Sequence, residues 1–246
     1  MNPIRITAVS YYNTLPFIYG LIHSGLLSGF ELSLDVPSEC ARKMASGEAD
    51  VGLIPVGALP GIPDYKLLSN LCIGADKDVK SVLLLSNVEL TGIKTVYLDT
   101  DSRTSVNLVK ILAKKFWNIA PDWKSLAELK GELSSAEGMV LIGDKTFGLS
   151  SKYPFCYDLA GEWIKYTGLP FVFAAWISRK TLPAGFEKDF QSALAWGVEH
   201  REESYKIADK LHISEHELIS YLKNDISYLL DANKLKGMEL FLKLLS

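Results

Sequence analysis

The sequence predicts an α/β fold of two lobes with a helical segment at its C-terminal end. Three observations lead to this prediction: strand and helix patterns alternate near the N-terminus, they alternate again after residue 93, and helical periodicity dominates from residue 185. The 246 residues are 48% hydrophobic and 22% charged, which is the composition of a globular protein with a sizeable core. We therefore expect mostly parallel sheets with flanking helices.

Short apolar runs and helix-terminating residues define the first α/β unit. Proline suits the first turn of a helix because its missing N–H would have no partner there, which places one helix start at Pro16. A second helix is expected to open at Pro37-Ser38 with Ser38 as its N-cap, and Gly25 and Gly47 are expected to end the two helices. Strands are predicted at residues 4–9, 31–36 and 50–54.

The remaining chain continues the same alternation and then becomes helical. A second α/β unit begins near residue 94, and no internal repeat or long linker interrupts it. Further strands are predicted at residues 65–68, 81–85, 94–98, 139–142 and 170–177, and helices at 104–117, 158–167, 185–210, 214–224 and 233–245.

Charge, cysteines and the N-terminal segment narrow the range of functions. Lys plus Arg number 26 against 29 for Asp plus Glu, so the chain lacks the basic footprint that nucleic-acid binding usually needs. Cys40, Cys72 and Cys156 form no C-x-x-C pair, which argues against a disulfide scaffold or a zinc knuckle. Residues 6–30 hold no Asp, Glu, Lys or Arg, but polar residues keep every apolar run well short of the ~18 residues of a membrane span. We expect a cytoplasmic protein that binds neither nucleic acid nor membrane.

Two short strings resemble catalytic motifs but fit them poorly. His212-Ile-Ser-Glu-His216 matches the H-x-x-E-H string of some zinc proteases, yet an S-x-x-E capping pattern would begin a helix at Ser214 and leave His212 outside it. Asp99-Thr-Asp101 resembles the paired aspartates of haloacid-dehalogenase-type phosphatases, but Arg103 stands where that pattern has Thr or Val. Dinucleotide, nucleoside-triphosphate and serine-hydrolase motifs are absent, and we expect no metal and no cofactor.

The start of the predicted helix at 104–117 offers a binding site for an anion. The first four N–H groups of a helix lack partners within it, and the aligned peptide dipoles make that end electropositive. Ser102, Thr104 and Ser105 add hydroxyl groups there, so a carboxylate or phosphate would be held well. Plain N-capping by Ser102, with Arg103 in solvent, explains the same residues equally well.

A second polar turn, Ser10–Thr14, follows the first predicted strand. Open α/β sheets bind ligands at the carboxyl ends of their strands, although a tight turn over packed aromatic rings is the alternative explanation. If both turns bind ligand, they face each other across a cleft and suit a small molecule with two anionic groups. None of the four histidines lies in either turn, so a proton transfer here would need another base.

Seven strings spread between residues 8 and 174 are specific enough to indicate a family. They are Ala8-Val-Ser-Tyr-Tyr-Asn-Thr-Leu-Pro16, Asp35–Arg42, Gly47–Pro55, Ser102-Arg-Thr-Ser105, Ile142-Gly-Asp144, Asp158–Trp163 and Thr167–Ala174. Together they closely resemble the chorismate dehydratases, which open the futalosine route to menaquinone. The resemblance runs from about residue 4 to the final helix.

This resemblance implies a fold and a reaction. The fold is that of type II periplasmic binding proteins, with one lobe of residues 1–86 plus 176–246, another of residues 87–175, and a substrate cleft between them. The reaction is the dehydration of chorismate to 3-[(1-carboxyvinyl)oxy]benzoate, in which the substrate's own enolpyruvyl carboxylate removes the C3 proton and the C4 hydroxyl departs. The protein would then orient the substrate and stabilise charge, with no need of a histidine base.

The resemblance also suggests residue roles. Asn13 matches an asparagine that family members place beside the reacting hydroxyl, and Ser81 matches a serine near the substrate, so both are expected to assist catalysis. Tyr12 stands where the family usually has Leu, and Arg103 would pair either with substrate or with a neighbouring Asp. The expected substrate-binding residues are Ser10, Ser102, Arg103, Thr104, Ser105, Gly143 and Asp144.

Other functions stay open at this point. A solute-binding protein or sensor would hold an anionic metabolite in the same cleft without changing it. The lyase that cleaves cyclic dehypoxanthine futalosine shares the fold but is expected to use a histidine in the cleft, where this chain has none. A purely structural role is hard to reconcile with two hydroxyl-rich turns at strand ends, and the sequence does not indicate the oligomeric state.

Overall fold

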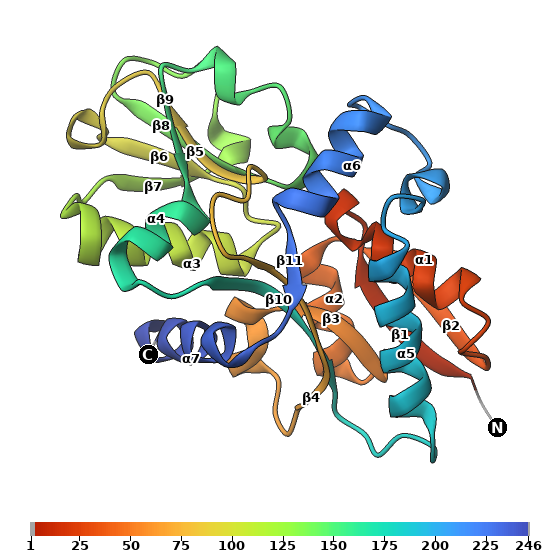
Figure 1. The fold of residues 1–246 in the computed structure, drawn as a ribbon. Helices are drawn as coiled ribbons and strands as arrows, with labels where there is room; N and C mark the ends of the chain where they lie inside the picture. Colours follow the sequence, from red (N-terminus) through yellow and green to blue (C-terminus); the bar gives the residue numbers. More distant parts are fainter. Residues whose placement is uncertain (1–2, 246) are drawn as a thin grey trace.

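The computed structural model describes residues 3–245, whose backbone forms two β-sheets with helices packed against them (Figure 1). The six-stranded sheet consists of β1 (Ile4–Val9), β2 (Phe30–Asp35), β3 (Val51–Pro55), β4 (Lys66–Ala75), β10 (Phe171–Ser178) and β11 (Ser227–Leu229), in the order β11-β4-β10-β3-β1-β2. The five-stranded sheet consists of β5 (Val82–Ser86), β6 (Thr95–Leu98), β7 (Asp122–Ser125), β8 (Glu137–Ile142) and β9 (Phe155–Asp158), in the order β7-β6-β8-β5-β9. The central strands β3 and β10 are buried along their whole length, which explains their nearly continuous apolar sequence.

Both sheets mix parallel and antiparallel pairs, which corrects the prediction of mostly parallel sheets. β1 pairs in parallel with β2 and β3, and β6 pairs in parallel with β7 and β8. Every other pair is antiparallel and includes β4, β5 or β10. These three strands adjoin the two passages of the chain between the sheets, so they do not follow the strand–helix–strand repeat that makes neighbours parallel.

Sheet membership also differs from the lobe boundaries implied by the resemblance, which lie after residues 86 and 175. β5 pairs with β8 and β9 and belongs to the five-stranded sheet, whereas the boundary at 86 assigns it to the other lobe. The boundary at 175 cuts through β10, which lies in the six-stranded sheet over its whole length. Pairing between distant strands decides both points, and an apolar run in the sequence does not specify its partner.

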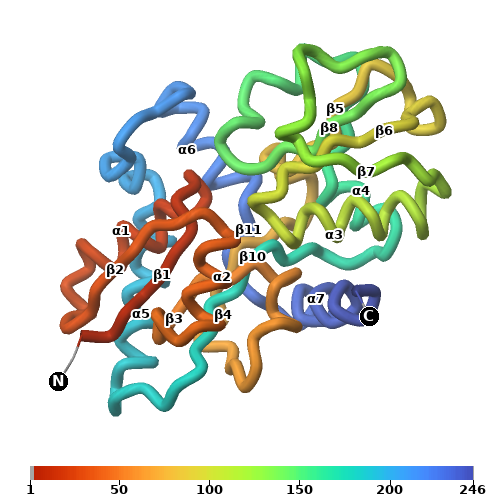
Figure 2. Tube along the Cα trace, turned by 180° about the vertical axis from the view of Figure 1, so that it is seen from behind, coloured from red at the N-terminus to blue at the C-terminus, as the bar shows by residue number. Residues whose placement is uncertain are grey.

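Helices flank both sheets, and the C-terminal helix lies where it contacts elements of both (Figure 2). On the six-stranded sheet, α2 (Pro37–Ser46) packs against β1 and β3, and α5 (Phe186–Glu199) contacts β4 and lies alongside α1 (Leu15–His23). α3 (Arg103–Leu112) and α4 (Leu159–Thr167) pack on the five-stranded sheet, α7 (Ala232–Leu245) contacts both β10 and α3, and α6 (Glu215–Asn224) lies next to the turn after β1. α1 and α5 approach closely because Gly20 faces Gly197, and a Cβ at either position would overlap the opposite backbone.

Local capping signals were predicted with mixed success. Ser214 is the N-cap of α6 and accepts the Glu217 N–H at 3.2 Å, so the prediction that His212 lies outside this helix is confirmed. At α2 the prediction was wrong: the N-cap is Val36, with no side-chain hydrogen bond, and Ser38 already lies inside the helix. The reason is Pro37, whose fixed φ angle and missing N–H place it at the first helical position.

Several element lengths differ from the predictions. β4 extends through Ala75, and the helix expected over 185–210 ends at Glu199, where the Nδ1 atom of His200 lies 2.8 Å from the Trp196 carbonyl oxygen. The helix expected over 104–117 is α-helical only to Leu112 and continues as one π-helical turn. The short strands β7, β9 and β11 were not predicted, because they are only partly buried and have no long apolar pattern.

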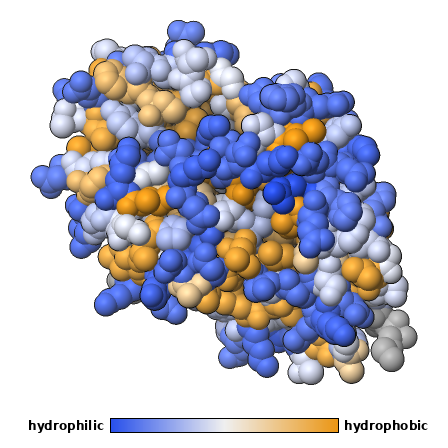
Figure 3. Space-filling view, viewed as in Figure 1, coloured by the Kyte–Doolittle hydropathy of each residue, from blue (hydrophilic) through white to orange (hydrophobic). Residues whose placement is uncertain are grey.

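One continuous apolar core joins the two sheets. Its largest fully buried side chains include Trp163, Trp176 and Phe171, whose rings pack edge-to-face with neighbouring phenylalanines. No helix within residues 3–245 is both long and apolar enough to cross a membrane. On the face shown in Figure 3, hydrophilic side chains divide the apolar surface into separate patches.

Candidate active site

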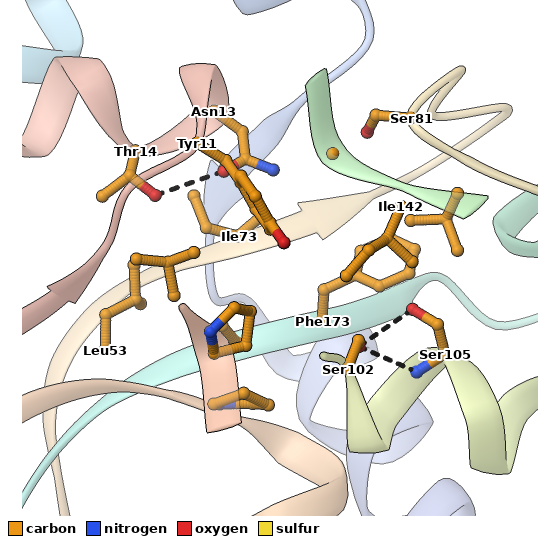
Figure 4. A pocket seen from close by; sticks show the side chains of 16 residues that line it. Tyr11, Asn13, Thr14, Leu53, Ile73, Ser81, Ser102, Ser105, Ile142 and Phe173 are labelled. Carbon is orange, nitrogen blue, oxygen red and sulfur yellow. Dashed lines mark hydrogen bonds between the residues drawn. The ribbon is translucent and has the colours of Figure 1, made fainter. Parts of the chain in front are cut away.

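A pocket lies between the two sheets and is lined by residues from both (Figure 4). The space between these residues, counted together with its opening to solvent, is about 500 Å³. Tyr11, Asn13 and Phe173 line it from the six-stranded sheet, and the side facing them includes Ser81, Ser102, Ser105 and Gly143. Both polar turns recognised in the sequence therefore border one common cavity.

The turn after β1 places Asn13 in the pocket. This turn is a short 3₁₀ segment, η1 (Tyr12–Thr14), and the Asn13 side-chain oxygen accepts the Thr14 hydroxyl at 3.2 Å. The Tyr228 hydroxyl donates to the Asn13 carbonyl oxygen at 3.0 Å, which fixes the backbone of the turn from the far side. With its oxygen engaged by Thr14, the Asn13 amide N–H₂ group remains the polar end available to other partners.

Ser81 lies immediately before β5, where the chain enters the five-stranded sheet. Its side chain is only 2% exposed, and its hydroxyl accepts the Tyr221 hydroxyl at 2.7 Å. The Ser81 carbonyl oxygen accepts the Gly143 N–H at 2.8 Å, so the two segments are held together. Gly143 has a positive φ angle of 65°, and a Cβ there would lie 3.0 Å from the Tyr11 ring. Only glycine satisfies both conditions without displacing Tyr11.

The start of α3 contributes two buried hydroxyls to the pocket. Ser102 is the N-cap, and its Oγ accepts the Ser105 N–H at 3.2 Å while donating to the Ser105 Oγ at 3.1 Å. Capping and pocket lining are thus combined in Ser102, although the sequence presented them as alternatives. Because the Ser105 hydroxyl receives this bond, its own hydrogen can point to a ligand at the electropositive end of the helix.

The other predicted substrate-binding residues lie outside the pocket. Thr104 is buried and turned away: its hydroxyl donates to the Phe173 carbonyl at 3.2 Å and accepts the Gly57 N–H at 3.0 Å, which docks α3 onto the opposite sheet. Arg103 is exposed. Ser10 and Asp144 border a neighbouring groove instead, where the Asp144 carboxylate accepts the Tyr12 N–H at 3.0 Å.

The described lining of the pocket holds no Asp, Glu, Lys, Arg or His, but carboxylates lie near Tyr11. Burial raises the pKa of Tyr11, and the nearby carboxylates of Asp99, Asp101 and Asp144 raise it further. The Tyr11 phenol therefore stays protonated and can donate a hydrogen bond across the pocket, into which its ring reaches in Figure 4. Lys145 pairs with Asp99 at 2.5 Å and partly offsets this negative charge.

Comparison with known proteins identifies the family. A family model described as menaquinone biosynthesis matches residues 4–246. The chain belongs to this family. Proteins named chorismate dehydratase from Thermus thermophilus and Campylobacter jejuni are each 30% identical to it, over 201 and 189 residues respectively. These matches span 74% of this chain and 72% and 71% of the two relatives.

The fold of this menaquinone biosynthesis family member is shared more widely. A Candida albicans protein, described as having the generic periplasmic binding protein structural fold, superposes with a TM-score of 0.70 at 11% identity. The superposition covers 100% of this chain and 90% of that chain. The α/β fold and its periplasmic-binding-protein character, which the resemblance implied, are thereby confirmed.

Tyr11 and Tyr221 are the polar residues at this site that the sequence reasoning missed. Tyr11 lies within the first quoted string, where packing of the aromatic rings beneath the turn was the alternative to ligand binding. Tyr221 belongs to α6 and stands 140 positions from Ser81, so no spacing in the sequence relates the two. The sequence also did not show which hydroxyls at the start of α3 face the pocket, because this depends on how α3 packs against the opposite sheet.

Proposed function

We propose that this protein is a chorismate dehydratase, which converts chorismate to 3-[(1-carboxyvinyl)oxy]benzoate and water. One observation carries the proposal: Asn13, Ser81 and the hydroxyls of Ser102 and Ser105 at the start of α3 border one pocket. Membership of the menaquinone biosynthesis family and the two relatives named chorismate dehydratase support the same reaction.

The reaction requires little acid–base machinery from the protein. The enolpyruvyl carboxylate takes the C3 proton, and the electron pair of that C–H bond moves into the ring. The C4–O bond then breaks with its electron pair on oxygen, and the departing hydroxide takes the proton from the new carboxylic acid to leave as water. Substrate atoms alone balance the reaction, so the pocket has to orient the substrate and stabilise charge as it develops.

The pocket residues fit these tasks. The Asn13 amide and the Ser81 hydroxyl would donate hydrogen bonds to the departing hydroxyl. The Ser105 hydroxyl at the N-terminus of α3 would hold a carboxylate, where the helix dipole favours negative charge. Apolar neighbours such as Phe173 would exclude water from the ring, which strengthens each of these hydrogen bonds.

Two further points belong to the same proposal. We place substrate between two lobes formed by residues 3–80 plus 171–245 and by residues 81–170, in accordance with sheet membership. We also place the protein in the cytoplasm, since its three cysteines are free thiols, as a reducing compartment favours.

The direct test is incubation of the purified protein with chorismate, followed by absorbance of the aromatic product and by proton NMR. We expect formation of one aromatic ether and no added metal or cofactor requirement. Calorimetric binding of chorismate with no conversion would instead favour a solute-binding protein. Conversion of cyclic dehypoxanthine futalosine, with chorismate unchanged, would favour the sibling lyase.

A further inference from the structure

Tyr221 contacts Ser81 without lining the pocket. It is 3% exposed, and its hydroxyl donates to the Ser81 Oγ at 2.7 Å. Its side chain borders a second cavity, together with Lys80 and Asp225. Tyr221 is therefore placed to act on the substrate only through Ser81.

The position of Tyr221 relative to Ser81 is fixed from several sides. The Phe147 ring packs edge-to-face against it, with centroids 5.0 Å apart and planes at 87°. Asp225, which caps the C-terminal end of α6, pairs at 2.9 Å with Lys80, the residue before Ser81. Because Asp225 is buried, this ion pair anchors α6 to the segment that carries Ser81.

Hydrogen-bond donation between the two hydroxyls has a defined direction. The Tyr221 hydroxyl donates to the Ser81 Oγ, and burial raises the pKa of Tyr221, so the phenol keeps the hydrogen that it donates. With Tyr221 donating to Ser81, the Ser81 hydrogen has no acceptor within residues 3–245 and is left for the pocket.

We propose that Tyr221 is a positioning residue that holds the Ser81 hydrogen toward the departing C4 hydroxyl of chorismate. Tyr221 donates to Ser81 and Ser81 donates onward to the substrate, and each bond in such a chain strengthens the next. When the C4–O bond breaks, its electron pair stays on the departing oxygen, which Ser81 stabilises before it takes the proton held by the enolpyruvyl carboxylic acid. This inference rests on the proposed dehydration, and it names the contact that orients the Ser81 hydroxyl for that reaction.

The test is a double-mutant cycle between Tyr221→Phe and Ser81→Ala. Tyr221→Phe keeps the ring against Phe147 and removes only the hydroxyl. We expect kcat to fall roughly 10-fold, because Ser81 can then rotate, with less than about a 3-fold change in product Kd. In the Ser81→Ala background, the same change is expected to have no further effect on kcat.

Tyr97→Phe is the matched control, since Tyr97 is also buried and its hydroxyl makes one hydrogen bond, to Glu137 at 2.9 Å, outside the pocket. We expect wild-type kcat from it. Should Tyr221→Phe not fold, 4-aminophenylalanine at position 221 retains an N–H donor of similar size and is expected to keep turnover within about 3-fold of wild type. Wild-type kcat in Tyr221→Phe, an equal loss in both backgrounds of the cycle, or loss of activity in a folded 4-aminophenylalanine protein would overturn the inference. Failure of the wild-type protein to convert chorismate would instead overturn the proposed function.

Discussion

The N–H of Tyr12 donates to the carboxylate of Asp144 at 3.0 Å and so joins the turn after β1 to the turn after β8, across the space between the two sheets. These turns also carry Asn13 and Gly143, which line the pocket. The contact therefore fixes the spacing of two pocket walls that are 130 positions apart in the sequence. It also places a carboxylate where burial disfavours its charge.

Asp144 is predicted to make stability depend on pH. Burial raises the pKa of Asp144 to about 6, although the Tyr12 N–H opposes this rise. An unfolded aspartate has a pKa of about 3.9, so between pH ~4 and ~6 the folded protein binds more protons, and the free energy of unfolding falls as pH rises. Asp144→Asn keeps an acceptor for Tyr12 and does not titrate. We expect the free energy of unfolding of this variant, relative to that of wild type, to be on the order of 1–2 kcal/mol higher at pH 7 than at pH 4, as measured by denaturant unfolding. An equal difference at both pH values would contradict the prediction.

Asn13→Ala and Ser81→Ala are predicted to reduce turnover far more than stability. Loss of one donor to a developing negative charge typically lowers kcat by ~10²–10³-fold. Ser81→Ala also leaves the buried Tyr221 hydroxyl without its acceptor, which costs about 1–3 kcal/mol of unfolding free energy. Steady-state kinetics with chorismate and denaturant unfolding check the two effects separately. If both variants turn over chorismate like wild type, the roles of these side chains are wrong.

Substitutions at Ser102 and Ser105 are predicted to distinguish the contribution of helix capping from that of ligand binding. Ser102→Ala removes the N-cap of α3, so we expect about 1 kcal/mol less stability together with weaker product binding. Ser105→Ala leaves the Ser102 cap intact, because it is the Ser105 backbone N–H that donates to Ser102. For this variant we expect product Kd to rise roughly 10-fold, the effect of ~1.4 kcal/mol, as measured by calorimetry. Unchanged binding in Ser105→Ala would show that this end of α3 serves folding alone.

Gly143→Ala is predicted to disturb the pocket beyond its effect on the backbone. Both Gly143 and Gly148 have positive φ angles, of 65° and 73°, so alanine at either position should cost about 1–2 kcal/mol of stability. Only at Gly143 would the added Cβ meet a side chain, the Tyr11 ring at 3.0 Å, whereas the space around Gly148 is open. We expect product binding to weaken in Gly143→Ala and not in Gly148→Ala. Equal binding by both variants would mean that Tyr11 moves aside without consequence.

Features determined by neighbouring residues were predicted from the sequence. Ser214 caps α6, and Gly168 follows α4 with a left-handed backbone, because such ends depend on hydrogen bonds within a few residues. Family-specific strings located Asn13, Ser102 and Ser105, and the resemblance to the family indicated Ser81; all four residues border the pocket. The error at Ser38 was also local, since Pro37 takes the first helical position.

Which hydroxyls face the pocket was decided by the tertiary structure. Ser102, Thr104 and Ser105 are equivalent candidates in the sequence, yet successive residues of a helix point about 100° apart. Gly57 fits so closely against the start of α3 that a Cβ would lie 2.8 Å from the Thr104 Cα, and this docking turns Thr104 toward the opposite sheet. Ser102 and Ser105 are left to line the pocket.

The sequence by itself determined the α/β class, most helices and strands, the family and the two turns that carry Asn13 and Ser102. Tertiary structure alone decided the antiparallel pairing of β5, which hydroxyls of α3 face the pocket, and the contact of Tyr221 with Ser81. The physical reason is the distance along the sequence between the residues that interact. Caps and apolar periodicity are set by residues within one or two turns, whereas strand pairing, helix docking and side-chain contacts between α6 and Ser81 form only when distant segments pack into a common core.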